Sequence, residues 1–254
     1  MRICGHSTCE RRCARVTTDG RTSGSVAWSP DGRRLVFGSL RDGPVNLFVQ
    51  AADGTGTAER ITTDTNVQFA GSWVQDGRTI VYFQSDPRTG FDKFTIWRAD
   101  LNAGNTSARV SKLGSGLGAR VSPDQRWLAY VTSVSGVVEA FVTTFPQQGQ
   151  RWQVSEGGGQ EVVWRADGRE LYFRRGDRLY AVPFDPSANP PVGRATVPLE
   201  GRYFYQPNNP GWPNYDVGPD GRFLMISSEE GPGDQVQIAL NWTKYLAARL
   251  AKSR

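Results

Sequence analysis

The chain has 254 residues, of which 38% are hydrophobic and 22% are charged, a balance typical of a folded domain with a sizeable core. Its net charge of +5 lies at the two ends, because residues 1–15 carry +3, residues 241–254 carry +4, and the segment between them carries −2. A nucleic-acid-binding surface needs a basic stripe on the folded body, so this distribution argues against a nucleic acid as partner.

The sequence contains no membrane span, because no apolar run approaches the ~20 residues that a transmembrane helix needs. The first residues, Met1-Arg-Ile-Cys-Gly-His-Ser-Thr-Cys-Glu, also lack the apolar centre of a secretory signal. The residues themselves therefore give no location for the protein.

A short phrase centred on Asp-Gly, or on Asp124-Gln125 in the third copy, recurs five times and organises the whole chain. Its first copy is Trp28-Ser-Pro-Asp31-Gly32, and an apolar burst, Leu35-Val-Phe37, follows within a few residues. The aspartates of the five copies, which are 45, 48, 43 and 53 residues apart, are Asp31, Asp76, Asp124, Asp167 and Asp220. A period in the forties is the signature of a four-stranded propeller blade, so the sequence predicts an all-β propeller of about five blades. We interpret the aspartates as turn formers, one per blade.

In chain order, the blades are predicted near residues 23–63, 68–112, 117–155, 160–199 and 214–240, within a propeller domain spanning 14–240. In each blade the innermost strand precedes the Asp-Gly turn, and a nearly unbroken apolar strand follows it, as expected for a strand covered on both faces. The fifth blade lacks a fourth strand.

The two ends of the chain are predicted to have different structures. Residues 1–13 are predicted to form a disordered leader, and residues 241–254 a short C-terminal helix. Residues 15–19, Arg-Val-Thr-Thr-Asp, nearly duplicate residues 60–64, Arg-Ile-Thr-Thr-Asp, which form the fourth strand of the first blade. They are therefore predicted to supply an outer strand to a blade that precedes the first one. That blade is either the fifth, in a closed ring, or one belonging to a larger ring of which this chain is a fragment.

The repeat resembles the TolB-type, or WD40-like, propeller repeat. In addition, Tyr215-Asp216-Val-Gly-Pro-Asp-Gly-Arg-Phe-Leu-Met, together with the later Asn241-Trp242, resembles the end of propellers fused behind bacterial serine/threonine protein kinases. This resemblance implies a sensor or interaction domain on the extracytoplasmic side of a membrane. No kinase motif is present, so the resemblance carries no kinase activity.

Three kinds of chemistry were weighed against a binding role. A Ser-His-Asp triad is excluded, because the only histidine, His6, lies outside the predicted propeller and no Gly-x-Ser-x-Gly occurs. A glycosidase would need two acids across a cleft, and beyond the turn aspartates only Glu161 and Asp216 lie near the inner strands. A metal site could draw on Cys4, His6, Cys9 and Cys13, but their spacing matches no usual zinc pattern. We therefore expect no enzyme, no metal and no cofactor.

The best candidate surface lies in the irregular segment before the fifth blade. It combines aromatic rings with amides, which are the side chains that recognition surfaces use. Its candidate residues for contact with a protein, a peptide or a small ligand are Tyr205, Asn208, Asn209, Trp212 and Tyr215. The alternative is that the same aromatics form a plug that fills a blade junction. The leading function is a binding or sensor propeller, and the alternative is the propeller part of a hydrolase that acts as a substrate gate or a sugar-binding ring.

Overall fold

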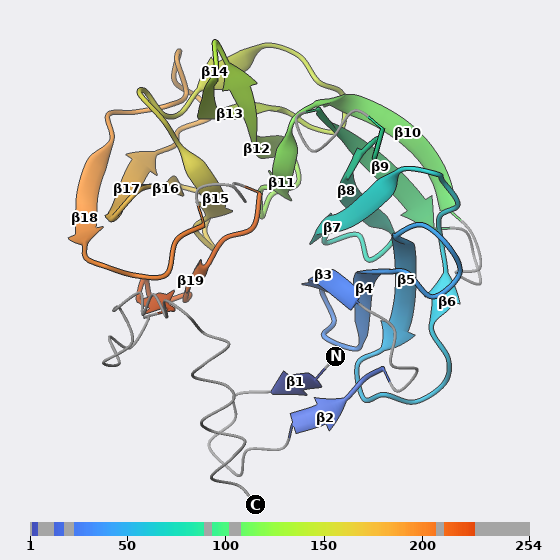
Figure 1. The fold of residues 1–254 in the computed structure, drawn as a ribbon. Coiled ribbons are helices and arrows are strands. Elements are labelled where there is room, and N and C mark those ends of the chain that lie inside the picture. Colours follow the sequence, from blue (N-terminus) through green and yellow to red (C-terminus); the bar gives the residue numbers. More distant parts are fainter. Residues whose placement is uncertain are drawn as a thin grey trace, which may run out of the picture.

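The computed structural model describes residues 2–4, 13–17, 23–88, 93–101, 108–206 and 211–226. Every regular element in these residues is a β-strand, and four four-stranded antiparallel sheets follow one another around a central axis (Figure 1). The predicted all-β propeller is confirmed.

Each blade is a simple meander in which neighbouring strands are consecutive in sequence. The first blade contains β3 (Ser23–Trp28), β4 (Arg34–Ser39), β5 (Asn46–Ala51) and β6 (Glu59–Arg60). The second contains β7 (Val67–Trp73), β8 (Thr79–Ser85), β9 (Phe94–Leu101) and β10 (Ala108–Ser115). The third contains β11 (Leu117–Val121), β12 (Trp127–Val134), β13 (Val137–Thr144) and β14 (Arg151–Gln153). The fourth contains β15 (Gln160–Trp164), β16 (Glu170–Arg175), β17 (Arg178–Pro183) and β18 (Thr196–Glu200).

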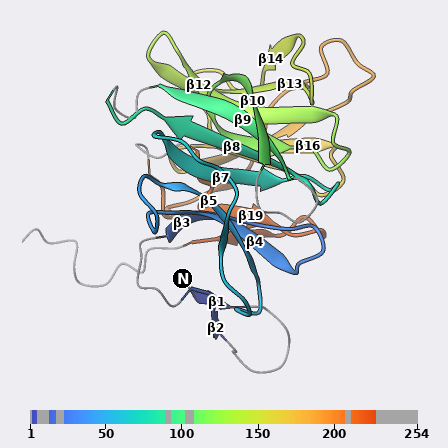
Figure 2. The ribbon, with the colours of Figure 1, turned by 90° about the vertical axis from the view of Figure 1, so that its right-hand side faces the viewer.

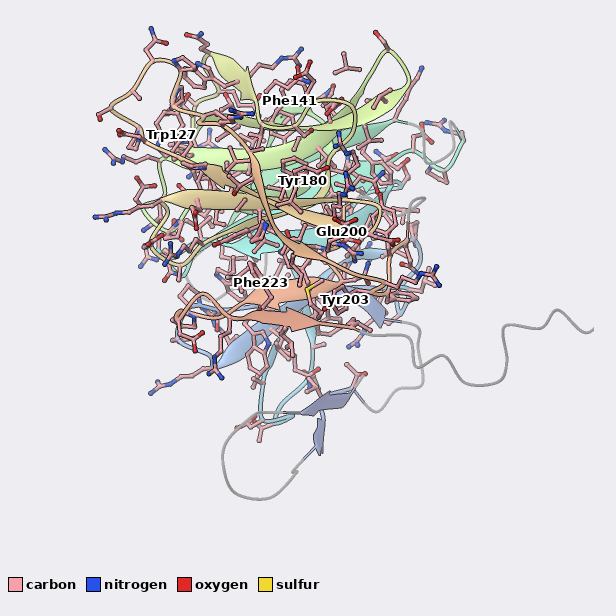
Figure 3. All side chains as sticks on the ribbon, turned by 90° about the vertical axis from the view of Figure 1, so that its left-hand side faces the viewer. Trp127, Phe141, Tyr180, Glu200, Tyr203 and Phe223 are labelled. Atoms are coloured by element: carbon pink, nitrogen blue, oxygen red, sulfur yellow. The ribbon has the colours of Figure 1, made fainter. Side chains whose placement is uncertain are left out.

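The fifth repeat forms a two-stranded sheet in the described residues, β19 (Tyr215–Val217) paired with β20 (Phe223–Met225). It packs on the fourth blade, where the rings of Tyr172 and Phe223 meet edge to face with centroids 5.2 Å apart (Figure 3). Its predicted third strand, at 235–240, and the predicted helix at 241–254 lie outside the described residues. Of the about five blades predicted, the fifth without its own fourth strand, the described part of the chain shows four complete blades and one pair of strands.

The core lies between the blades rather than inside any one of them. The second strand of the first blade shows why, since Val36 faces the second blade while Leu35 and Phe37 face the opposite way. All three side chains are fully buried. Alternate residues of a strand point to opposite faces of its sheet, so a strand covered on both faces is apolar throughout. The apolar burst that follows each Asp-Gly turn meets this requirement.

The repeated aspartates close the turn between the first and second strands of each blade. In all five copies the carboxylate accepts a hydrogen bond from the backbone N–H of the arginine two residues later, at 2.8–3.2 Å, as for Asp76 and Arg78. The glycine after Asp31, Asp76, Asp167 and Asp220 has a positive φ, and at the third turn Gln125 takes this conformation with a φ of 62°. These contacts are the geometry expected of an Asx turn.

The N-terminal residues differ from the prediction in two ways. Residues 1–13 were expected to be disordered, yet β1 (Arg2–Cys4) pairs with β2 (Cys13–Arg15) as a small antiparallel sheet beside the first blade (Figure 2). Residues 15–19 were expected to supply an outer strand either to the fifth blade or to a blade of a larger ring. Among the described residues β2, which ends at Arg15, pairs with β1 instead, and residues 18 and 19 lie outside the described ranges.

The packing of Val16 nevertheless resembles that of an outer strand. Val16 is buried against Leu35, Phe37 and Phe48 of the first blade. Ile61, its counterpart after the first blade, is buried in the same way against the second blade. The near-identity of the two pentapeptides therefore reflects a shared packing position more than a shared hydrogen-bonded strand.

Candidate functional site

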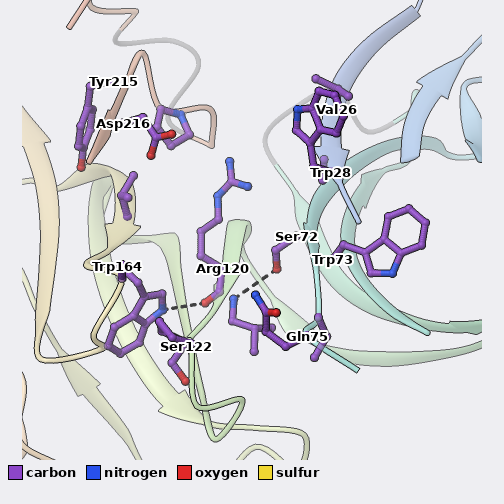
Figure 4. A pocket seen from close by; sticks show the side chains of 17 residues that line it. Val26, Trp28, Ser72, Trp73, Gln75, Arg120, Ser122, Trp164, Tyr215 and Asp216 are labelled. Carbon is purple, nitrogen blue, oxygen red and sulfur yellow. Dashed lines mark hydrogen bonds between the residues drawn. The ribbon is translucent and has the colours of Figure 1, made fainter. Parts of the chain in front are cut away.

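A pocket of about 590 Å³ lies at the centre of the described blades, where the innermost strands end (Figure 4). Each of the five repeats contributes the residue that stands four places before its turn aspartate. These equivalent positions, all of which line the pocket, are Ala27, Ser72, Arg120, Val163 and Asp216. The pocket is therefore a property of the ring as a whole, since no single blade could form it.

A β-bulge in each of the first four innermost strands decides which residues reach the pocket. The pairing with the second strand skips at the bulge, for example between Gln160 and Val163. The bulge residues Ser25, Gly118 and Glu161 have φ values of 43°, 63° and 57°, in the left-handed region. One extra residue reverses the alternation of side chains beyond it, so the bulge decides which of the following residues face the channel and which, like Trp73 and Trp164, pack against a neighbouring blade.

Arg120 carries a positive charge into this pocket (Figure 4). Its guanidinium donates one hydrogen bond to the carbonyl of Gly71 in the second blade, while its buried Nε has no hydrogen-bond partner. Desolvation lowers the pKa of the guanidinium, and the nearby charge of Asp216 opposes this shift. Within the described part of the chain, no carboxylate lies at salt-bridge distance from Arg120. A desolvated guanidinium without an ionic partner binds anions strongly.

The apolar wall of the pocket contains an exposed tryptophan. Trp28, Trp73 and Trp164 occupy the same position in their repeats, but Trp28 is 47% exposed whereas the other two are 7% and 8% exposed. Trp73 and Trp164 are buried against the preceding blade, and the indole N–H of Trp164 donates to the carbonyl of Arg120 at 3.0 Å. Trp28 belongs to the first blade, and its ring stays accessible beside Val26, which is 43% exposed.

Trp212 of the predicted recognition segment packs inward, whereas Pro213 and Tyr215 of the same segment line the pocket. Trp212 lies between blades with its ring 5.0 Å from the rings of both Phe69 and Phe83 in the second blade. Its neighbour Gly211 lies so close to Gly118 that a Cβ on Gly118 would be 2.8 Å from the Gly211 Cα. This packing matches the plug that was the alternative interpretation of the segment.

The other candidates of that segment are placed as follows. Tyr215 is buried and its hydroxyl donates to the carbonyl of Glu161 at 2.7 Å. Tyr205 presents its ring to the guanidinium of Arg174 at 5.0 Å. Asn208 and Asn209 lie outside the described residues. A role of these five residues in binding a partner stays a prediction, although Tyr215 also lines one side of the pocket.

The comparisons with known proteins agree with this architecture. The model of the TolB beta propeller domain matches residues 7–176, more than half of the chain. The chain belongs to the TolB β-propeller family. TolB from Acinetobacter baumannii is 20% identical with a TM-score of 0.60 over 87% of this chain and 58% of that one. The putative TolB of Agrobacterium tumefaciens is 17% identical with a TM-score of 0.63 over 86% of this chain and 79% of that one.

At these identities, the two structures support the fold of the TolB propeller and not its partners. The chain spans 58% of the length of the Acinetobacter protein. No curated protein matches the sequence. The matched family model and these two structures are TolB propellers, so the resemblance to propellers behind kinases stays a prediction.

The two carboxylates considered for sugar chemistry are not brought together in this TolB propeller. Asp216 lines the pocket, whereas Glu161 is fully buried between blades and is absent from the lining. Glu161 lies 3.7 Å from the equally buried Arg174 and accepts a hydrogen bond from the Asn214 side chain at 2.8 Å. Burial raises the pKa of Glu161, and the contacts to Asn214 and Arg174 oppose that shift. Through Asn214, Glu161 thus holds the segment directly before β19 to the fourth blade.

The predicted metal ligands fall largely beyond what the structure describes. His6 and Cys9 lie outside the described residues, and the pairing of β1 with β2 places Cys4 opposite Cys13 in register. The described residues contain no group of three or more side chains suited to a metal ion. Within the same residues, no helix is long and apolar enough to cross a membrane.

The sequence reasoning missed Arg120. A signal existed, because the residue four places before each turn aspartate varies from Ala27 to Arg120 and Asp216 while its surroundings repeat. A variable position within a conserved-looking repeat unit marks a surface free of packing constraints. Whether Arg120 points toward the channel depends on the β-bulge that precedes it in β11.

Proposed function

We propose that this TolB-family propeller is a non-catalytic binding module that grips a protein or peptide in its central pocket. The proposal rests on the pocket, which is lined by an exposed tryptophan, Trp28, and by an arginine without an ionic partner, Arg120. Trp and Arg are the residues that most often dominate protein–protein binding energy. The complete blades around the pocket pack on one another through buried side chains, as between the first and second blades and between the third and fourth.

The composition of the pocket supports binding over catalysis. In the part of the chain that the structure describes, its lining contains one carboxylate, Asp216, and no histidine or cysteine. General acid–base catalysis by carboxylates needs two groups placed across a substrate, and Glu161, the other acid considered, is engaged with Arg174.

The natural context of the module is a further part of the proposal. The resemblance of residues 215–242 to propellers behind bacterial kinases supports an extracytoplasmic position at the C-terminal end of a signalling kinase. The gene segment that precedes the codon for Met1 tests this part. A kinase domain followed by a membrane span would support it, and a hydrolase domain in the same reading frame would favour the alternative, a substrate gate or sugar-binding ring.

Peptide selection tests the binding role directly. We expect short random peptides displayed on phage to be enriched by the purified protein. Ala166→Trp places a bulky ring on an exposed residue of the pocket lining, and it should weaken the selected peptides at least about tenfold. Val197→Trp is the matched control, because Val197 is 45% exposed on the outer strand β18, away from the pocket.

Two results would contradict the proposal. One is a selection that enriches no peptide. The other is a set of peptides that bind the Ala166→Trp variant as tightly as the unmodified protein, since their site would then lie elsewhere.

A further inference from the structure

We propose that Arg120 is the anchor of the pocket and that it takes a carboxylate group of the ligand, with the apolar group next to that carboxylate resting on Trp28. The inference rests on the proposed binding function and adds to it the chemistry that the ligand must carry. The carboxylate belongs either to an aspartate or glutamate side chain of a peptide or to its C-terminus.

The first argument is the comparison of two arginines in the same fold. Arg174 is buried and fully engaged, because it lies 3.7 Å from Glu161 and donates to the carbonyls of Phe204 and Gly176 at 2.6 and 3.0 Å. This is the pattern of a structural arginine. Arg120 has one carbonyl partner, Gly71, and a buried Nε that is left without any.

The unpaired Nε has an energetic consequence. A guanidinium that is removed from water needs hydrogen-bond acceptors, and leaving a buried charged donor unsatisfied costs free energy. A carboxylate can accept two parallel hydrogen bonds from one edge of a guanidinium, and such pairs are among the strongest that proteins form. A ligand carboxylate in the pocket would therefore give the Arg120 guanidinium the ionic partner that the described residues do not supply.

The second argument concerns the class of anion. Among the described residues that line the pocket, Arg120 is the only cationic one, and Asp216 supplies the only negative charge. The Asp216 charge is close enough to act on the pKa of Arg120. A phosphate group, with its two negative charges and its preference for several cations, would be repelled by Asp216 and held by one arginine alone. A singly charged carboxylate fits this balance.

The third argument places the group attached to the carboxylate. Trp28 and Val26 present exposed apolar surface on the first blade, on the side of the pocket that faces Arg120 (Figure 4). An aromatic ring exposed next to a charged anchor is the usual composition of a binding hot spot. An apolar side chain adjacent to the carboxylate would cover this surface.

Nuclear magnetic resonance of the arginine Nε–H groups tests the anchor without any knowledge of the natural ligand. The probes are 3-phenylpropionate and its amide, 3-phenylpropanamide, which differ only in the charged group. The Arg120 signal is assigned by its loss in Arg120→Lys, a variant that keeps the charge. We expect a saturable shift of this signal with the acid and no shift with the amide. Equal shifts with both probes, or no shift up to the solubility limit of the acid, would overturn the inference.

Selected peptides then identify the source of the carboxylate. Each is made with its acidic residues replaced by amides or with its C-terminus amidated, and the change that weakens binding at least about tenfold identifies the source. Arg120→Met should reproduce that loss, while Arg126→Met, which removes an exposed arginine paired with Asp124, should not. Peptides that bind Arg120→Met undiminished would overturn the carboxylate inference and leave the binding function standing. A shift of the Arg120 signal with 3-phenylpropionate in a protein that selects no peptide would support the carboxylate inference and contradict the proposed peptide-binding function.

Discussion

Replacing two equivalent tryptophans by phenylalanine should have unequal effects, because only one of them uses its indole N–H. Trp73 and Trp164 stand three residues before their turn aspartates and are 7% and 8% exposed, so their packing is closely matched. The Trp164 N–H donates to the carbonyl of Arg120 at 3.0 Å, whereas the buried Trp73 N–H has no partner. The pair therefore separates hydrogen bonding from packing.

The magnitudes follow from these contacts. Either change to alanine should cost about 3–5 kcal/mol, the range for truncating a buried tryptophan. Changing either to phenylalanine leaves a similar small cavity. Trp164→Phe also deprives the Arg120 carbonyl of its donor, at about 1 kcal/mol, while Trp73→Phe removes an unsatisfied buried N–H and regains about 1 kcal/mol. Trp164→Phe should thus be about 2 kcal/mol more destabilising than Trp73→Phe.

Urea unfolding followed by circular dichroism measures this difference, with the midpoints compared at a common slope. The arginine contact of Trp73, 4.9 Å from the Arg34 guanidinium to the ring centroid, does not confuse the comparison, since phenylalanine also offers an aromatic face. The reasoning would be refuted by equal midpoints for the two phenylalanine variants, or by a lower midpoint for Trp73→Phe.

Three further changes test other contacts of the fold. Glu161→Ala should lower the free energy of unfolding by about 3–5 kcal/mol, because it leaves Arg174 charged and buried without its ion partner. The double variant with Arg174→Met should recover much of this loss, and a double variant no more stable than Glu161→Ala would contradict the explanation. Gly118→Ala should lower the thermal midpoint, because its φ of 63° is strained for alanine and its Cβ would collide with the neighbouring segment, and an unchanged midpoint would contradict that close approach. Burial tends to raise the pKa of Asp76, but the hydrogen bonds from Thr79 outweigh it and the pKa is lowered below 3.8. The ionised carboxylate therefore stabilises the fold above pH 3.8 and loses this contribution as the pH falls through its lowered pKa. The loss of stability caused by Asp76→Asn, measured by urea unfolding, should accordingly shrink between pH 7 and pH 2, and a loss that stays constant would contradict this.

The repeat made the fold predictable, because a propeller blade leaves two marks that do not depend on distant contacts. The Asp-Gly turn needs an aspartate to accept a backbone N–H and a residue with positive φ, and both are visible in the sequence at Asp31 and Gly32. The strand after the turn is apolar throughout because it is covered on both faces. The turn recurs in all five repeats and the strand covered on both faces in the four complete blades, whereas Leu224 of the fifth repeat is 70% exposed.

The site could not be predicted in the same way, because the bulge of each innermost strand is not visible as a pattern. The bulge at Glu161 directs this acid between blades, while Asp216, also expected near the inner strands, reaches the pocket. The aromatic segment before β19 was similarly ambiguous. Composition alone could not tell an exposed recognition loop from rings packed at a blade junction, and the position of Trp212 among the phenylalanines of the second blade became apparent only in three dimensions.

The central claim is that ligands bind in the central pocket, and fluorine magnetic resonance of the protein labelled with 5-fluorotryptophan tests it most directly. A selected peptide is added while the resolved tryptophan signals are followed, each assigned by a tryptophan-to-phenylalanine variant. The account predicts that the signal of Trp28 moves, while those of Trp127 and Trp152, which pack against each other with ring centroids 5.8 Å apart and do not line the pocket, stay in place. Movement of the Trp127 and Trp152 signals with a stationary Trp28 would contradict it.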